Sequence, residues 1–167
     1  LEKVKLQGRY SGYDTDDCII FGDNGNKMLC QIKHSISINN SDEVFNDVIK
    51  AAWNDFNNNN LFNKNNDCIN IIVSGLSKVD IESLRTIKAW ANSCENEDEF
   101  ITKINMSDFS SKEKKQKFEI IQNHLKQVKE DLTDKEIWQF LKVFSINILD
   151  VDTPNTFIKS SYMSALE

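Results

Sequence analysis

Residues 16–33 read DDCIIFGDNGNKMLCQIK and decide the fold of this chain. Two short apolar runs flank the polar turn sequence at 23–26, which contains an Asn-Gly pair. Asn and Gly tolerate the positive φ angles of tight hairpin turns, so this pair predicts a β-hairpin. The hairpin would bring the acidic pair Asp16-Asp17 close to the sequence Gln31-Ile32-Lys33.

The regions around the hairpin predict a mixed α/β protein. Residues 4–8 alternate and predict a further strand before it. After it, Ser41 is a good N-cap, and the apolar residues within 44–56 recur at helical spacing. The continuous apolar run at 68–73 predicts a buried central strand. The order strand, strand, strand, helix, strand indicates one mixed sheet with the hairpin at its centre.

The second half of the chain predicts mainly helices. Capping-box sequences at 110–113 and 133–136 open two apolar stripes at helical spacing. A late strand is predicted within 144–151, and Pro154 would stand at the first position of a final helix. We see no internal repeat and no flexible linker.

Composition indicates one domain. The chain has 167 residues, of which 40% are hydrophobic and 28% charged, as is typical of a soluble globular domain. We predict a single domain over residues 1–167, with a core at 1–76 and a helical elaboration at 77–167. The chain starts without Met, which suggests a domain excised from a longer protein.

Charge and residue patterns limit the classes of function. The apolar runs are too short for a membrane helix, and there is no secretion leader, so we expect a cytoplasmic protein with no membrane partner. The four cysteines are widely spaced, which argues against a zinc site. A net charge of −6 argues against a protein that coats DNA without specificity.

Side-chain alternation predicts how the residues at the end of the hairpin point. Gln31 and Lys33 lie two apart, so they share one face of the strand. Ile32 points to the other face, where it can pack into the core while its carbonyl oxygen stays near Gln31 and Lys33.

The register of the hairpin decides which aspartate meets Lys33. Pairing of residue 23 with residue 26 places Asp16 opposite Lys33, and pairing of 23 with 27 places Asp17 there. We favour Asp17, because it directly precedes the apolar strand.

These groups suit a hard divalent cation. Mg²⁺ prefers oxygen ligands, and Asp17, Gln31 and the Ile32 carbonyl offer three, with Asp16 as a neighbour. A cation there would neutralise a phosphate and activate water, while Lys33 would orient that water or stabilise the transition state. The plainer interpretation is that these residues are only the solvated edges of a hairpin.

The same residues resemble the PD-(D/E)xK nuclease superfamily, in its Asp…Gln-x-Lys variant. The longer match runs from residues 12–17 through 31–35 to the helix at 51–53. It is similar to the DNA endonuclease effector domains of bacterial anti-phage systems. These include cyclic-oligonucleotide-activated nucleases and the amino-terminal nuclease domain of antiviral STAND NTPases. The resemblance covers residues 1 to about 150.

The resemblance implies a restriction-endonuclease-like mixed sheet with flanking helices and Mg²⁺-dependent or Mn²⁺-dependent hydrolysis of DNA. It makes Asp17 the principal metal ligand with Asp16 beside it, places Gln31 where the family usually has Glu or Asp, and makes Lys33 the catalytic lysine. The first helix of the family's αβββαβ order is missing here, because residues 4–8 already predict a strand.

The partners that the resemblance implies are double-stranded DNA, a sensor or NTPase module of the same polypeptide, and sibling copies in an active homo-oligomer. The alternative is a non-catalytic module that uses the nuclease fold to bind nucleic acid or a protein partner. A weaker third hypothesis is a purely structural interaction domain, without metal binding.

Overall fold

One mixed sheet organises the chain, seen here in a computed structural model that describes residues 1–149 except 16, 107 and 109. The strand order is β1-β2-β3-β4-β5, with antiparallel pairing from β1 to β3 and parallel pairing from β3 to β5. The strands are β1 (Lys3–Leu6), β2 (Cys18–Phe21), β3 (Lys27–Ser35), β4 (Cys68–Gly75) and β5 (Phe144–Ile148).

Five α-helices follow in the described residues, four of them in the second half of the chain. They are α1 (Glu43–Asn57), α2 (Lys78–Ser93), α3 (Glu97–Asn105), α4 (Lys112–Val128) and α5 (Asp134–Val143), and a short 3₁₀ turn, η1 (Gly8–Ser11), joins β1 to β2. The predicted mixed α/β class, central hairpin and helical second half are therefore confirmed. The late strand is confirmed as β5, whereas the helix predicted from Pro154 lies outside the described residues.

The helix starts follow the predicted capping chemistry with two shifts of one residue. Asp42, and not Ser41, caps α1, because its carboxylate accepts the Phe45 N–H. Ser111, and not Ser110, caps α4. Thr133 opens α5 with the predicted capping box. Ser and Asp are nearly equivalent as N-caps, so sequence alone does not choose between neighbouring candidates.

A three-residue loop closes the hairpin between β2 and β3. The Gly22 N–H donates to the Asn26 carbonyl (2.9 Å), and the Gly25 N–H donates back to the Gly22 carbonyl (3.0 Å). Gly25 has a φ of 78°, the left-handed conformation that glycine adopts without steric cost. A type I turn followed by a left-handed residue is a common three-residue hairpin loop. The predicted hairpin is therefore confirmed, in a register set by Gly22 and Asn26.

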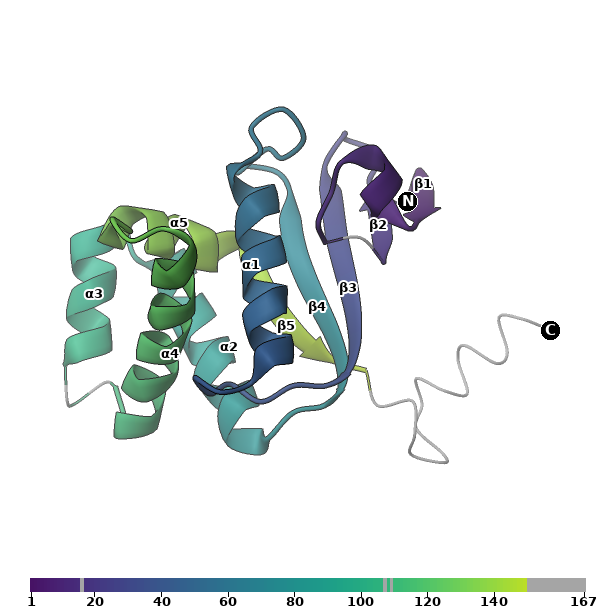
Figure 1. Cartoon of the computed structure of the whole chain (residues 1–167). Coiled ribbons are helices and arrows are strands. Elements are labelled where there is room, and N and C mark those ends of the chain that lie inside the picture. The colour runs from purple at the N-terminus through teal and green to yellow at the C-terminus, as the bar shows by residue number, and fades with distance from the viewer. Residues whose placement is uncertain (16, 107, 109, 150–167) are drawn as a thin grey trace.

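The helices cover one face of the sheet. Figure 1 shows them on one side of β3 and β4, with α1 lying along these two strands. Residues of that face are fully buried, as at Leu29, Ile69 and Ile71, and α1 covers them with side chains such as Phe45, which is also fully buried. Burial of this apolar face is the main source of the fold's stability.

The other face of the sheet is partly open. Ile32 is 57% exposed and Val4 48% exposed, while Ile20, Met28 and Ile72 are only half-buried. The prediction that Ile32 packs into the core is therefore wrong. The side chain points away from Gln31 and Lys33 as predicted, but no described helix covers it.

No α-helix in the described part of the chain has the length and apolar character needed to cross a bilayer.

Candidate functional site

The observed hairpin register corrects both predicted pairings of the aspartates. Cys18 pairs with Cys30, and Phe21 pairs with Lys27. One further step along this register places Asp17 opposite Gln31, and not opposite Lys33. The loop pairs Gly22 with Asn26, so the register is shifted by one residue from the first alternative and by two residues from the favoured one.

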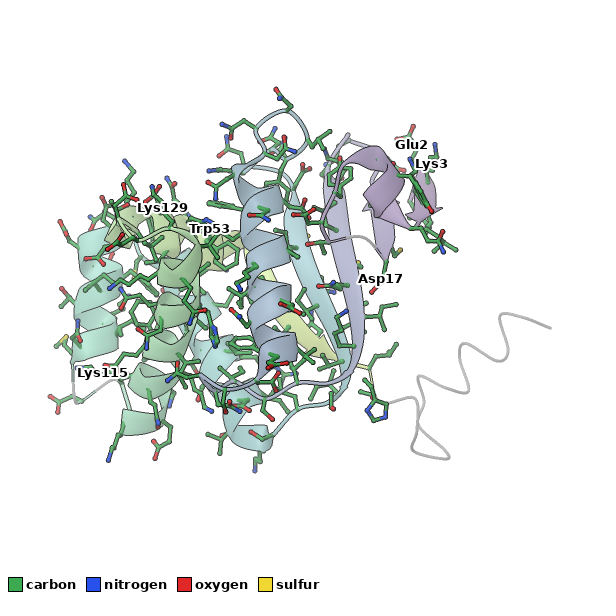
Figure 2. The ribbon with its side chains drawn as sticks, in the orientation of Figure 1. Glu2, Lys3, Asp17, Trp53, Lys115 and Lys129 are labelled. Atoms are coloured by element: carbon green, nitrogen blue, oxygen red, sulfur yellow. The ribbon has the colours of Figure 1, made fainter. Side chains whose placement is uncertain are left out.

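Asp17, which is labelled in Figure 2, lies immediately before β2, and two hydrogen bonds hold it there. Its Oδ2 accepts the Ile32 N–H at 2.6 Å, and its own main-chain carbonyl accepts the Gln7 N–H at 3.1 Å. This short hydrogen bond holds the carboxylate against β3. At this point β2 no longer pairs with β3, because β2 begins at Cys18. A charged acceptor makes such a hydrogen bond stronger than a neutral one.

The main chain of Ile32 faces the same edge. Gly22 and Asn26 form a hydrogen-bonded pair, so every second residue of β3 from there turns its N–H and C=O toward β2. This series includes Cys30 and Ile32, and the bond from the Ile32 N–H to Asp17 agrees with it. Because β2 begins at Cys18, the Ile32 carbonyl lies just past the end of its partner strand. Its oxygen and the Asp17 carboxylate therefore share one strand edge.

Gln31 supplies a buried oxygen on the helix-covered face. Its side chain is 9% exposed, and Oε1 has no hydrogen-bond partner among the described residues. An unpaired buried polar atom costs about 1–3 kcal/mol of stability. Thr15 Oγ1 and Asn26 Oδ1 are buried without a partner in the same way, and a cation at Gln31 would supply the partner that its Oε1 lacks.

Lys33 lies two residues further along the same face and is half-buried. Within the described residues its ammonium makes no ion pair. The strand register thus places Asp17 beside Gln31 and Ile32, and Lys33 follows two residues after Gln31 on β3. Asp16 lies outside the described residues.

Asp55, which the sequence analysis missed, positions the loop that leads to Asp17. It is fully buried on α1, and its two carboxylate oxygens accept the N–H groups of Asp14 (2.9 Å) and Thr15 (2.6 Å). Burial raises the pKa of this carboxyl, while the two N–H donors oppose the rise. A signal was present in the sequence, since Asp55 lies on the apolar stripe of an otherwise amphipathic helix.

The donors suit a hard cation better than a soft one. Carboxylate, amide and main-chain oxygens are ligands that Mg²⁺ accepts, so the residues present fit this ion. Burial raises the pKa of the nearby Cys30 thiol to about 11, which disfavours the thiolate that soft metals need. Among the described side chains, no three His, Cys, Asp or Glu residues gather to hold a metal ion. The candidate site therefore depends on one described carboxylate and on neutral oxygens.

Comparison with known proteins adds no support to the nuclease resemblance, which is based only on the residues quoted from the sequence. The chain matches no protein-family model, no curated protein and no solved structure.

Proposed function

We propose that this domain is a metal-dependent DNA endonuclease that hydrolyses phosphodiester bonds with Mg²⁺, or Mn²⁺ in its place. The observation that carries the proposal is the buried Gln31 Oε1 without a partner, on the same face as Lys33 and opposite Asp17. A solvated hairpin edge, the plainer interpretation, does not explain why an amide oxygen is buried there unpaired.

Each residue has a distinct role in this proposal. The carboxylate of Asp17, Oε1 of Gln31 and the main-chain oxygen of Ile32 would hold the cation. The two carboxylate oxygens of Asp17 would have different tasks. Oδ2 accepts the Ile32 N–H, and Oδ1 would bind the metal. The bound cation supplies positive charge that offsets the charge of the scissile phosphate. Lys33 donates hydrogen bonds to the phosphate oxygens and stabilises the extra negative charge of the transition state.

The biological setting follows from the resemblance alone. We propose that the domain is the effector of a bacterial anti-phage system and cuts double-stranded DNA. A sensor or NTPase module in the same polypeptide would control it. Cutting both strands generally needs two active sites, so we propose that the active form is a homo-oligomer.

A second function is favoured by one specific observation. The carboxylate of Asp17 already has a structural task, because it satisfies the Ile32 N–H beyond the end of β2. That task needs no metal. A non-catalytic module that binds nucleic acid or a protein partner would retain Asp17 for this reason alone.

A plasmid-cleavage assay separates the two functions. The protein is incubated with supercoiled DNA and either Mg²⁺ or Mn²⁺, and nicked and linear products are quantified. We expect cleavage, and we expect Lys33→Ala to reduce it about 10²–10³-fold without loss of folding. The matched control is Lys126→Ala, an exposed lysine on α4, which α1 separates from β3 in Figure 1. Binding of DNA without cutting would support the non-catalytic module, and full activity of Lys33→Ala would exclude the proposed mechanism.

A further inference from the structure

Two cysteines face each other across the hairpin, on the face of the sheet that no described helix covers. The strand register pairs Cys18 of β2 directly with Cys30 of β3. Directly opposed residues of an antiparallel pair point their side chains to the same face, and these two thiols are close enough to interact. Both cysteines are free. The hairpin therefore holds two reduced thiols side by side.

The backbone spacing of this pair suits a disulfide bond. Gly22 and Asn26 form a hydrogen-bonded pair, and Cys18 and Cys30 lie four residues further along each strand, so they form another. The Cα atoms of such a pair lie about 5.5 Å apart, within the range of about 4.4–6.8 Å that disulfides span. The Cβ atoms lie about 5.5 Å apart, however, and a disulfide draws them to about 3.8 Å. A bond made here is therefore strained, and strained disulfides are readily reduced.

The other two cysteines lie where neither can replace a member of this pair. Cys68 of β4 lies opposite Met28, which is two residues from Cys30 on β3. One strand spacing and two residues of rise separate the Cα atoms of Cys68 and Cys30 by about 8 Å, beyond the limit of about 7 Å for a disulfide. Cys94 is the C-cap of α2 and lies outside the sheet. Of the four cysteines, only Cys18 and Cys30 are paired by the register.

The two thiols differ in their access to solvent. Cys18 is half-buried, whereas Cys30 is 1% exposed. A small oxidant therefore reaches Cys18 first, and Cys30 is placed to attack the product from the adjacent strand. An accessible thiol that reacts first and a neighbouring thiol that resolves the product are the two parts of a reversible thiol switch.

We propose that Cys18 and Cys30 form a redox modification site, which a low-molecular-weight disulfide such as glutathione disulfide converts reversibly to a cross-strand disulfide. The Cys18 thiolate attacks one sulfur of glutathione disulfide, which forms a mixed disulfide and releases one glutathione thiolate. The Cys30 thiolate then attacks Sγ of Cys18 and releases the second. The two protons that the cysteines lose pass to the two glutathione thiolates, so two protein thiols are oxidised and one glutathione disulfide is reduced.

The bond would join the two strands directly beside the candidate site, because Asp17 precedes Cys18 and Gln31 follows Cys30. The hairpin that carries these residues would be closed by hydrogen bonds alone in the reduced protein and by a covalent bond in the oxidised protein. The redox site stands apart from the proposed nuclease activity, because neither thiol belongs to the proposed cation site.

Oxidation of the reduced complete chain with glutathione disulfide, in the absence of metal ions, tests the site. We expect two of the four thiols to be lost, a peptide map that joins Cys18 to Cys30 within one chain, and recovery of both thiols with dithiothreitol. Cys18→Ser should prevent the reaction, and Cys30→Ser should trap the mixed disulfide at Cys18. Cys68→Ser and Cys94→Ser are the matched controls and should retain the bond.

Three results would overturn the proposal. They are retention of all four thiols, a mixed disulfide at Cys18 that persists in the unaltered chain, and a disulfide between two copies of the chain. Mass spectrometry of the intact protein distinguishes them. Should Cys30→Ser lose the helical circular dichroism of the native fold, that variant is misfolded, and Cys18→Ser and the peptide map decide. Plasmid cleavage does not enter this test, so the redox site and the nuclease activity fail or succeed separately.

Discussion

The two faces of the sheet are built from the same strands but differ in what lies against them. On one face Leu29, Ile69 and Ile71 are fully buried under the helices. On the other, Ile32 and Val4 are about half exposed. The covered face supplies most of the stability. Among the described strand residues on that face, Gln31 is the one that is both polar and buried, and it belongs to the candidate site.

The largest effect on stability should come from the covered face. Phe45→Ala removes a fully buried ring of α1 and should lower the free energy of unfolding by about 3–5 kcal/mol. The matched change on the open face, Val4→Ala, should stay within about 0.5 kcal/mol. Chemical denaturation of both variants measures the contrast. Equal losses would contradict the division into a stabilising and an open face.

A smaller effect is expected where the covered face meets the loop before β2. Asp55→Asn leaves one of two buried N–H groups, those of Asp14 and Thr15, without its acceptor, so stability should fall by about 1–3 kcal/mol. The loop that carries Asp17 should also loosen, so cation affinity should drop. Asp14→Asn, a change at an exposed neighbour, serves as the control. Unchanged amide exchange at residues 14–17 would show that Asp55 does not position the loop.

Replacing Gln31 should not destabilise the fold, although replacing a buried residue usually does. Gln31→Leu removes an unpaired buried polar atom, so stability should stay the same or rise by up to about 1 kcal/mol. The same change should weaken cation binding about tenfold, which is about 1.4 kcal/mol of binding free energy. Gln31→Glu is the control that keeps an oxygen ligand. A loss of stability in Gln31→Leu with unaltered cation binding would assign Gln31 a purely structural role.

The smallest effect concerns a surface pair far from the sheet. The Lys129 ammonium, hydrogen-bonded to Glu136, lowers the pKa of this carboxyl to about 2 from its ordinary 4.5. A depressed carboxyl pKa stabilises the fold above pH 4.5, and this contribution is lost as the pH falls toward 2. About a third of each side chain is exposed to solvent, which screens the pair, so the contribution should be under ~1 kcal/mol. Denaturation curves of the protein and of Glu136→Gln between pH 5 and pH 2 should converge at the acid end; a constant gap would contradict the linkage.

The fold was largely predictable from the sequence because its signals are local. Apolar periodicity identified α1, the continuous run identified β4, and the Asn-Gly pair identified the hairpin. These patterns follow directly from helix and strand geometry. The exposure of Ile32 was not predictable, because alternation gives the direction of a side chain and not what lies against it.

The candidate site was predictable in composition but not in register. Residue types and spacing suggested its members, yet Asp17 lies opposite Gln31 and not opposite Lys33. The observed closure differs from the favoured pairing by two residues of register, and an Asp-Asn-Gly-Asn turn allows several closures. Asp55 escaped attention because its role depends on a loop some 40 residues away in the sequence.

The most direct test of the candidate site is a titration of isotope-labelled protein with Mn²⁺, followed by NMR. Bound Mn²⁺ broadens the signals of nearby amides. We predict that broadening begins at Asp17, Gln31, Ile32 and Lys33 and that excess Mg²⁺ reverses it. Broadening centred elsewhere, or none at these residues at millimolar Mn²⁺, would contradict the claim that this strand edge binds a divalent cation.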